Sequence, residues 1–223
     1  MLTPVFPLGT AYLPGDEVVL RVFEERYVQL MRDINDSNLS FASVLISQGS
    51  EVGGGDKRFS YGVMIDVINI ALSDVGLIVQ AVATDRIRVV EWKADDPYPR
   101  AEVEVVVNES LAQNKYHDAA SALSLLAQNV RTLRESIAAL QSIDDPATTS
   151  APLLNTIASG RWWTTGVSAQ EVERAFWTVA RHVPCGPMDR YELLQPPSVV
   201  ERISRLRYMV EHVTEIVAFQ RQK

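Results

Sequence analysis

The sequence is poor in cysteine and in long apolar runs, and each shortage excludes a class of protein. A single cysteine, Cys185, excludes an internal disulfide and a cysteine-cluster metal site. No apolar run reaches the ~18–20 residues that span a membrane. The first residues also lack the basic and apolar regions of a signal peptide. We therefore expect a soluble, cytoplasmic protein with no membrane partner.

Motifs for catalysis and cofactor binding are also missing. The glycine-rich residues 53–58 lack the G-x-x-x-x-G-K-[S/T] spacing that binds phosphates, and they lie between two predicted strands. His182 and Cys185 are three residues apart, which suggests a base and a nucleophile, but Pro184 between them breaks a helix. His117 and His212 have no second ligand type at metal spacing. We predict no catalytic residue, no metal and no cofactor.

The most informative stretch is residues 5–31, VFPLGTAYLPGDEVVLRVFEERYVQLM, which reads as strand, loop, strand and helix. Pro7 and Pro14 lack the N–H that a central strand donates, so they belong at strand ends or edges. Residues 16–23 alternate between apolar and other side chains, which predicts a half-buried strand. Apolar residues then recur three and four apart, as in an amphipathic helix: Tyr27, Leu30, Met31 and Ile34.

Further strands are predicted at residues 41–47, 61–70, 76–84 and 86–92, which are rich in β-branched residues. Ser73-Asp74 and Thr84-Asp85 separate the last three runs, and such short separators predict an antiparallel meander. Residues 100–107 alternate, which predicts a strand with one inward face: Ala101, Val103, Val105 and Val107. About six strands and one early helix can close into a small barrel or a curled sheet.

The second half of the chain has helical periodicity. Apolar residues from Ala119 to Leu140 follow a spacing of four and three, and this helix is expected to end at Asp144-Asp145-Pro146. A short helix is expected near residues 153–157. Two capping boxes, Ser168 with Glu171 and Ser198 with Glu201, predict the starts of two more helices. We predict a β domain at 1–110 and an antiparallel helical bundle at 111–223.

The order F-P-L-G, proline loop, V-V-L-R-V and F-E-E-R-Y resembles the N-terminal substrate-recognition domain of Lon proteases. The later D-R-I-R-V and Y-P-R-A-E-V-E extend the resemblance over most of the chain. It implies an α+β fold, in which a PUA-like β domain precedes a helical bundle, and a role in holding polypeptide for a protease. A full Lon protease adds an ATPase and a serine–lysine peptidase, and we expect this chain to carry the recognition part alone.

The junction between the second strand and the first helix is the predicted polypeptide-binding surface: Phe23, Glu24, Glu25, Arg26 and Tyr27. The aromatic residues would contact an apolar segment and the charged ones would set polarity, while a neighbouring sheet edge captures backbone. Alternatively, the two glutamates only stabilise the first helical turn. The loop at residues 49–58 is either a plain connector or a mobile lip over a binding surface.

A second candidate is a partner patch at Trp162 and Trp163, although paired tryptophans also pack between helices. The expected partners are unfolded or tagged polypeptide and a protease or chaperone, with the oligomeric state open. Two other functions stay open. One is RNA binding, for which the net charge of −7 is unfavourable unless Arg21, Arg26, Arg86 and Arg88 form a local basic patch. The other is a cryptic hydrolase.

Overall fold

The computed structural model describes the whole chain except residues 37, 142–150, 165 and 222–223. Its contacts divide it into two compact units. The first contains Met1–Val107 together with Arg190–Gln195, and the second contains Asn108–Asp189 and the residues from Pro196 onward. The predicted division at residue 110 assigned Arg190–Gln195 to the helices, whereas in the structure this short segment packs with the sheet.

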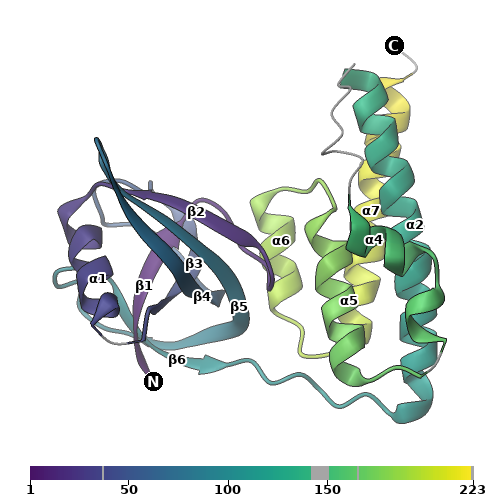
Figure 1. The fold of residues 1–223 in the computed structure, drawn as a ribbon, viewed down its shortest axis with the longest axis horizontal. Helices are drawn as coiled ribbons and strands as arrows, with labels where there is room; N and C mark the ends of the chain where they lie inside the picture. The colour runs from purple at the N-terminus through teal and green to yellow at the C-terminus, as the bar shows by residue number, and fades with distance from the viewer. Residues whose placement is uncertain (37, 142–150, 165, 222–223) are drawn as a thin grey trace. The chain divides into compact units, whose positions relative to one another are not determined.

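One six-stranded sheet forms the first unit (Figure 1). Its strands are β1 (Leu2–Leu8), β2 (Glu17–Val22), β3 (Ser40–Gln48), β4 (Lys57–Ser73), β5 (Gly76–Trp92) and β6 (Arg100–Val105). They are hydrogen-bonded in the order β2-β5-β4-β3-β1-β6, and β5 also pairs with β6. This extra pairing closes every strand except β2 into a ring, which confirms the predicted α+β fold with a barrel-like sheet.

β5 is one long strand where the sequence predicts two. Between Val63 and Ile65 on β4, the partner on β5 moves from Arg86 to Ala83, so β5 carries one extra residue at this point. Thr84 and the residue after it therefore lie in a bulge rather than a turn, and a bulge bends its strand. Before the bend β5 pairs with β2, and after it β5 pairs with β6.

Two apolar groups pack against the two faces of the sheet. One consists of small and branched residues from four ring strands: Val5, Ala42, Val44, Ile87, Val89, Ala101 and Val103. The other includes Phe6 and Phe41 and is covered by helix α1 (Glu25–Asn35), whose buried residues are the four predicted ones. The prediction that Val105 and Val107 face inward is wrong, because the strand ends at Val105 and these side chains are 55% and 80% exposed.

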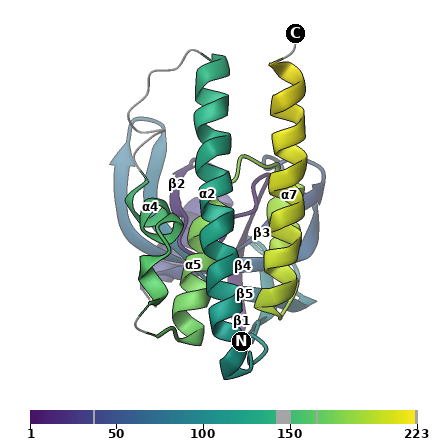
Figure 2. The same ribbon diagram turned by 90° about the vertical axis from the view of Figure 1, so that its right-hand side faces the viewer.

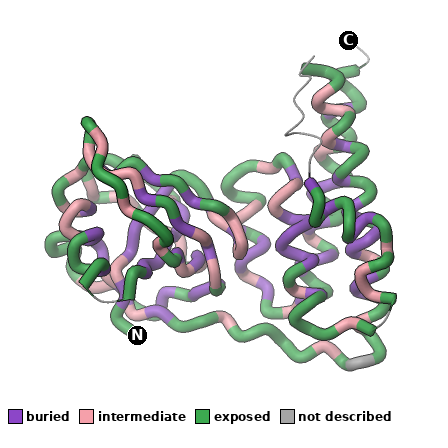
Figure 3. The backbone as a smooth tube through the Cα atoms, in the orientation of Figure 1, coloured by how far each residue is buried: buried purple, intermediate pink, exposed green. Residues whose placement is uncertain are grey.

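Helices make up the second unit, with burial concentrated at their facing sides (Figure 3). They are η1 (Gln113–Lys115), α2 (Tyr116–Gln141), α4 (Pro152–Ala158), η2 (Arg161–Trp163), α5 (Ala169–Arg181) and α7 (Val199–Gln220). Helix α6 (Pro187–Leu194) begins in this unit, and its residues from Arg190 onward belong to the first unit. The predicted short helix near 153–157 is confirmed as α4. The expected helix end at Asp144-Asp145-Pro146 lies outside the described residues.

The two long helices, α2 and α7, run parallel to each other rather than antiparallel as predicted (Figure 2). Arg221, just past the end of α7, donates to the carbonyl of Ser136 near the end of α2 at 3.4 Å. Short loops make consecutive helices antiparallel, but α4, α5 and α6 intervene here and bring the chain back to the starting end. Burial decreases along both helices, and Leu140 is already 38% exposed.

Only one of the two predicted capping boxes forms. Ser168 accepts a hydrogen bond from the N–H of Glu171 at 3.2 Å, and Glu171 accepts one from the N–H of Ser168 at 2.8 Å. Ser198 precedes α7 as predicted, but its side chain caps nothing. Glu201 instead pairs with Arg205, one turn further along, at 2.8 Å.

Helix α6, which the sequence analysis did not predict, carries the segment that packs with the sheet. Arg190 forms an ion pair with Asp16 and donates to the carbonyl of Ala11 at 2.7 Å. The ring of Tyr191 lies 4.4 Å from that of Phe59. These contacts explain why this part of α6 belongs to the first unit.

Candidate functional site

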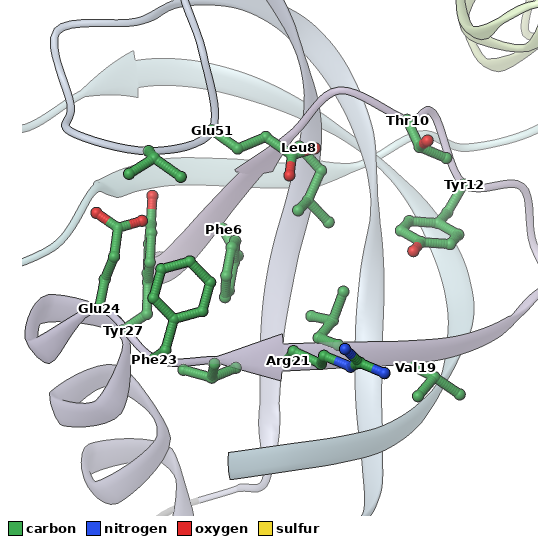
Figure 4. Close-up of a pocket in the computed structure, with 13 residues that line it drawn as sticks. Phe6, Leu8, Thr10, Tyr12, Val19, Arg21, Phe23, Glu24, Tyr27 and Glu51 are labelled. Carbon is green, nitrogen blue, oxygen red and sulfur yellow. The ribbon is translucent and has the colours of Figure 1, made fainter. Parts of the chain in front are cut away.

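A pocket of about 360 Å³ lies in the first unit, between β1 and β2 (Figure 4). Its lining residues come from β1 and the segment after it, from β2, from the start of α1 and from the loop after β3: Phe6, Leu8, Thr10, Tyr12, Val19, Leu20, Arg21, Val22, Phe23, Glu24, Tyr27, Glu51 and Val52. Residues 19–23 are consecutive, and consecutive side chains of a strand point to opposite faces. The pocket therefore runs along the edge of β2.

This edge of β2 carries no ladder in the described part of the chain, since β5 is the neighbour of β2 on the other side. The carbonyl of Asp16 accepts from Ala83 of β5 at 2.9 Å, so the even-numbered residues of β2 point their backbone groups toward β5. The backbone N–H and C=O groups of Val19 and Arg21 consequently point toward the pocket. A row of such groups is a template for pairing with another chain.

The floor of the pocket is aromatic. The rings of Phe6 and Tyr27 stack with centroids 3.9 Å apart and an angle of 9° between their planes. Tyr27 is only 2% exposed, and burial raises its pKa to about 12, so it stays neutral and structural. Phe23 lies at the same end of the pocket in Figure 4, but 60% of its surface is exposed. Phe23 is thus available to a ligand, whereas Tyr27 supports the floor.

The predicted surface residues divide between the pocket and the outer face of α1. Phe23, Glu24 and Tyr27 line the pocket. Arg26 does not line it, but it pairs with Glu24 at 3.1 Å and lies over the ring of Tyr27 at 4.4 Å. Glu25 points away and pairs with Arg32 at 3.4 Å on an exposed face. That any of the five binds polypeptide stays a prediction.

The loop before β4 reaches the rim of this pocket. Glu51 and Val52 line it, the N–H of Gly53 donates to Glu24 at 3.3 Å, and Arg26 donates to the carbonyl of Glu51 at 3.4 Å. Sequence reasoning offered a lip at this loop only as an alternative and did not single out Glu51. The chain separation between Glu51 and the strand–helix junction explains this, because no local period connects them.

The tryptophan pair is half-buried in the second unit. The indole N–H groups of Trp162 and Trp163 both donate to the hydroxyl of Ser124 on α2, at 3.1 and 3.2 Å. Trp163 also contacts the ring of His117 edge-on, with centroids 5.7 Å apart. These contacts fix the pair against α2, and its role as a partner patch stays a prediction.

The arginines proposed as a basic patch have other partners. Arg86 is 4% exposed and donates to the carbonyl of Leu194 at 2.7 Å, which removes it from any surface. Arg88 pairs with Glu104 at 2.7 Å and Arg26 pairs with Glu24. Within the described residues, Arg21 has no ion pair of this kind and lies at the surface. Arg86 therefore cannot contribute to the local basic patch that the RNA-binding alternative would need.

The residues considered for catalysis and metal binding have defined surroundings in the described part of the chain. His182 contacts the carbonyl of Thr178 through Nδ1 at 2.7 Å, which fixes it on the helix that precedes Cys185. No group of three His, Cys, Asp or Glu side chains is placed to hold a metal ion in the described part of the chain. Among the described helices, none has the length and apolar character needed to cross a membrane.

Comparisons with known proteins agree with this architecture. The model of one family, the ATP-dependent protease La (LON) substrate-binding domain, matches residues 3–212. The crystal structure of a Lon N-terminal domain protein from Xanthomonas campestris is 22% identical, with a TM-score of 0.59 over 93% of this chain and 98% of that one. The N-terminal domain of Mycobacterium avium complex Lon protease is 13% identical, with a TM-score of 0.61 over 95% and 98%. No curated protein gives a match. At these identities the two structures show a shared fold.

Proposed function

Because the chain belongs to the family of the ATP-dependent protease La (LON) substrate-binding domain, we propose that it binds polypeptide segments in an extended conformation along the free edge of β2. The observation that carries the proposal is the course of the pocket along that edge, next to exposed apolar side chains. Unfolded polypeptide offers both unpaired backbone groups and apolar side chains, and this site has a partner for each.

The two kinds of contact have different roles. Val19 and Arg21 supply backbone donors and acceptors that are independent of the ligand's sequence. Phe23, with Phe6 below it, supplies an apolar surface for one side chain of the ligand. A site that relies on backbone and one apolar contact accepts many sequences, as a receptor for unfolded chains requires.

We further propose that the module breaks no bond itself and presents its ligand to a protease or a chaperone. The proposal is supported by the family to which the chain belongs, because the model of that substrate-binding domain matches residues 3–212. ATP-independent capture of polypeptide without cleavage is the activity expected of the purified chain. Cleavage of casein by the purified protein, lost on a single substitution, would contradict this part.

The test is fluorescence anisotropy with a labelled, unstructured peptide of about ten uncharged residues containing one leucine. Phe23→Ser should weaken binding about five- to tenfold, the loss of roughly one buried apolar contact. Leu153→Ser on α4 is the matched control, since Leu153 is exposed to a similar extent, 65%, and lies in the other unit. Equal affinities for wild type and both variants would place the binding surface elsewhere.

Backbone pairing has its own test. A strand added to one edge uses every second residue of the ligand, so the same peptide is made twice, N-methylated at odd or at even positions. In one of the two peptides, the methyl groups replace the N–H groups that face β2. This peptide should bind at least tenfold more weakly than the parent. If neither methylated peptide binds more weakly than the parent, the ligand is not held as an added strand.

A further inference from the structure

We propose, on the basis of the function above, that the carboxylate of Glu51 occupies the place of a ligand carbonyl at the edge of β1. A bound polypeptide then displaces Glu51 and is held between β1 and β2 rather than on β2 alone. The ligand in this proposal is an extended polypeptide segment, and Glu51 acts as its resident competitor.

The hydrogen bonds along β1 show which of its backbone groups face this gap. The N-terminal ammonium of Met1 donates to the carbonyl of Val103 in β6 at 3.0 Å, on the edge of β1 opposite β3. The N–H of Val5 donates to the carbonyl of Pro99 at 2.8 Å on the same edge. Because alternate residues of a strand face the same edge, Pro7 and Gly9 are next on this edge. The β6 ladder has ended by then, at Pro4.

Of Pro7 and Gly9, only Gly9 has a backbone N–H on this edge of β1, so the edge can bind one acceptor here. Pro7 has no N–H to give. The N–H of Gly9 donates to Oε1 of Glu51 at 2.5 Å, the contact that a carbonyl of a neighbouring strand would otherwise make. A carboxylate oxygen and a peptide carbonyl are both acceptors for this donor, so one can replace the other. Glu51 also lines the pocket, so it stands where the ligand would lie.

Residues 51–53 of the loop are joined to α1 by two hydrogen bonds at the surface. Arg26 donates to the carbonyl of Glu51 and Gly53 donates to Glu24, at 3.4 and 3.3 Å. Gly53 and Gly55 have positive φ angles, 96° and 74°, and an added Cβ at either would meet nothing within 4 Å. Exchanging these exposed contacts for ligand contacts costs little, which allows the loop to withdraw Glu51.

The experiment compares wild type, Glu51→Ala and Glu135→Ala with the uncharged leucine peptide described above. Glu135→Ala on α2 removes the same charge from an exposed site in the other unit. Glu51→Ala should tighten binding about three- to tenfold, the change that one hydrogen bond typically contributes. Amide hydrogen exchange at Gly9 is the second readout. Its N–H should be protected in free wild type, exposed in Glu51→Ala, and protected again when the peptide is added to that variant.

The outcomes separate this inference from the proposed function. If Glu51→Ala binds the peptide no more tightly than wild type, or if the peptide leaves Gly9 of that variant exposed, the ligand does not use the β1 edge and the inference is wrong. Binding to β2 would stand in that case, since Phe23→Ser reports on it independently. If neither wild type nor Glu51→Ala binds the peptide, both the function and the inference are wrong.

Discussion

Arg202 is a fully buried cation at the start of α7, and it joins three parts of the second unit. It forms an ion pair with Glu173 of α5, donates to the carbonyl of Pro196 at 2.7 Å and to Asn108 at 3.3 Å. It also lies 5.4 Å from the centroids of two rings of α5, those of Phe176 and Trp177. Burial lowers the pKa of Arg202, and the carboxylate of Glu173 opposes this shift.

Removing this side chain should therefore destabilise the protein strongly. Arg202→Ala removes the charged partner of the Glu173 carboxylate and a donor to the carbonyl of Pro196, and we expect a loss of about 3–5 kcal/mol in the free energy of unfolding. Arg205→Ala, in the same helix but with a more exposed ion pair, should change it by less than about 1 kcal/mol. Urea denaturation measures both, and comparable losses would show that Arg202 is not a centre of stability.

Asp56 links stability to acid pH. Burial alone would raise the pKa of Asp56, but the hydrogen bond and charge of Arg58, 2.6 Å away, lower it below its usual value. A carboxylate with a lowered pKa stabilises the folded state above its unfolded pKa of 3.8, and this contribution is lost as the pH falls through the folded pKa. Asp56→Asn should thus lose stability at pH 6, and this loss should shrink progressively as the pH is lowered below 3.8. Asp74→Asn at the exposed hairpin turn is the control, and a pH-independent loss at Asp56 would rule out this linkage.

At the scale of elements, the two serines that precede α5 and α7 make a matched pair. Ser168 caps its helix through its side chain and Ser198 does not. The hydrogen bonds from Ser168 also lower the pKa of Glu171, which shows that the box stabilises the charged carboxylate. Ser168→Ala should cost about 1 kcal/mol, and Ser198→Ala only a few tenths. Thermal or urea unfolding of the two variants checks this, and similar losses would mean that the capping contact adds nothing.

The same elements show which features a sequence can predict. The local spacing of apolar residues was sufficient to predict β2 and α1. Each element buries one face, and the apolar residues of that face recur at a regular interval within the element. Thr84-Asp85 looked like a turn because polar residues there interrupt an apolar run, but a bulge accommodates the same residues when the strand changes partners. Ser198 and Ser168 have the same local signature, so only the structure distinguishes them.

The candidate site was predictable in part for a related reason. Phe23 and Glu24 lie at a visible change of period, from two to three and four, and the structure places both in the pocket. Glu51 and Phe6 reach the same pocket from positions far along the chain, through the ring of strands. Contacts between residues far apart in the sequence leave no periodic pattern in the local sequence. The packing of Arg190–Gln195 against the sheet is another contact of this kind.

At the scale of the whole molecule, Arg190–Gln195 is part of the first unit although it lies far along the chain. Tyr191 is 6% exposed and packs on Phe59, Ala11 and Leu45 of the sheet unit. Tyr191→Ala should cost about 3–5 kcal/mol, as other buried aromatic truncations do. Native-state hydrogen exchange shows where the loss occurs. If the segment is energetically part of the sheet unit, amides of β3 and β4 should lose protection while those of α5 and α7 keep theirs. The reverse pattern would assign the segment to the helices, and the sheet would then be stable without it.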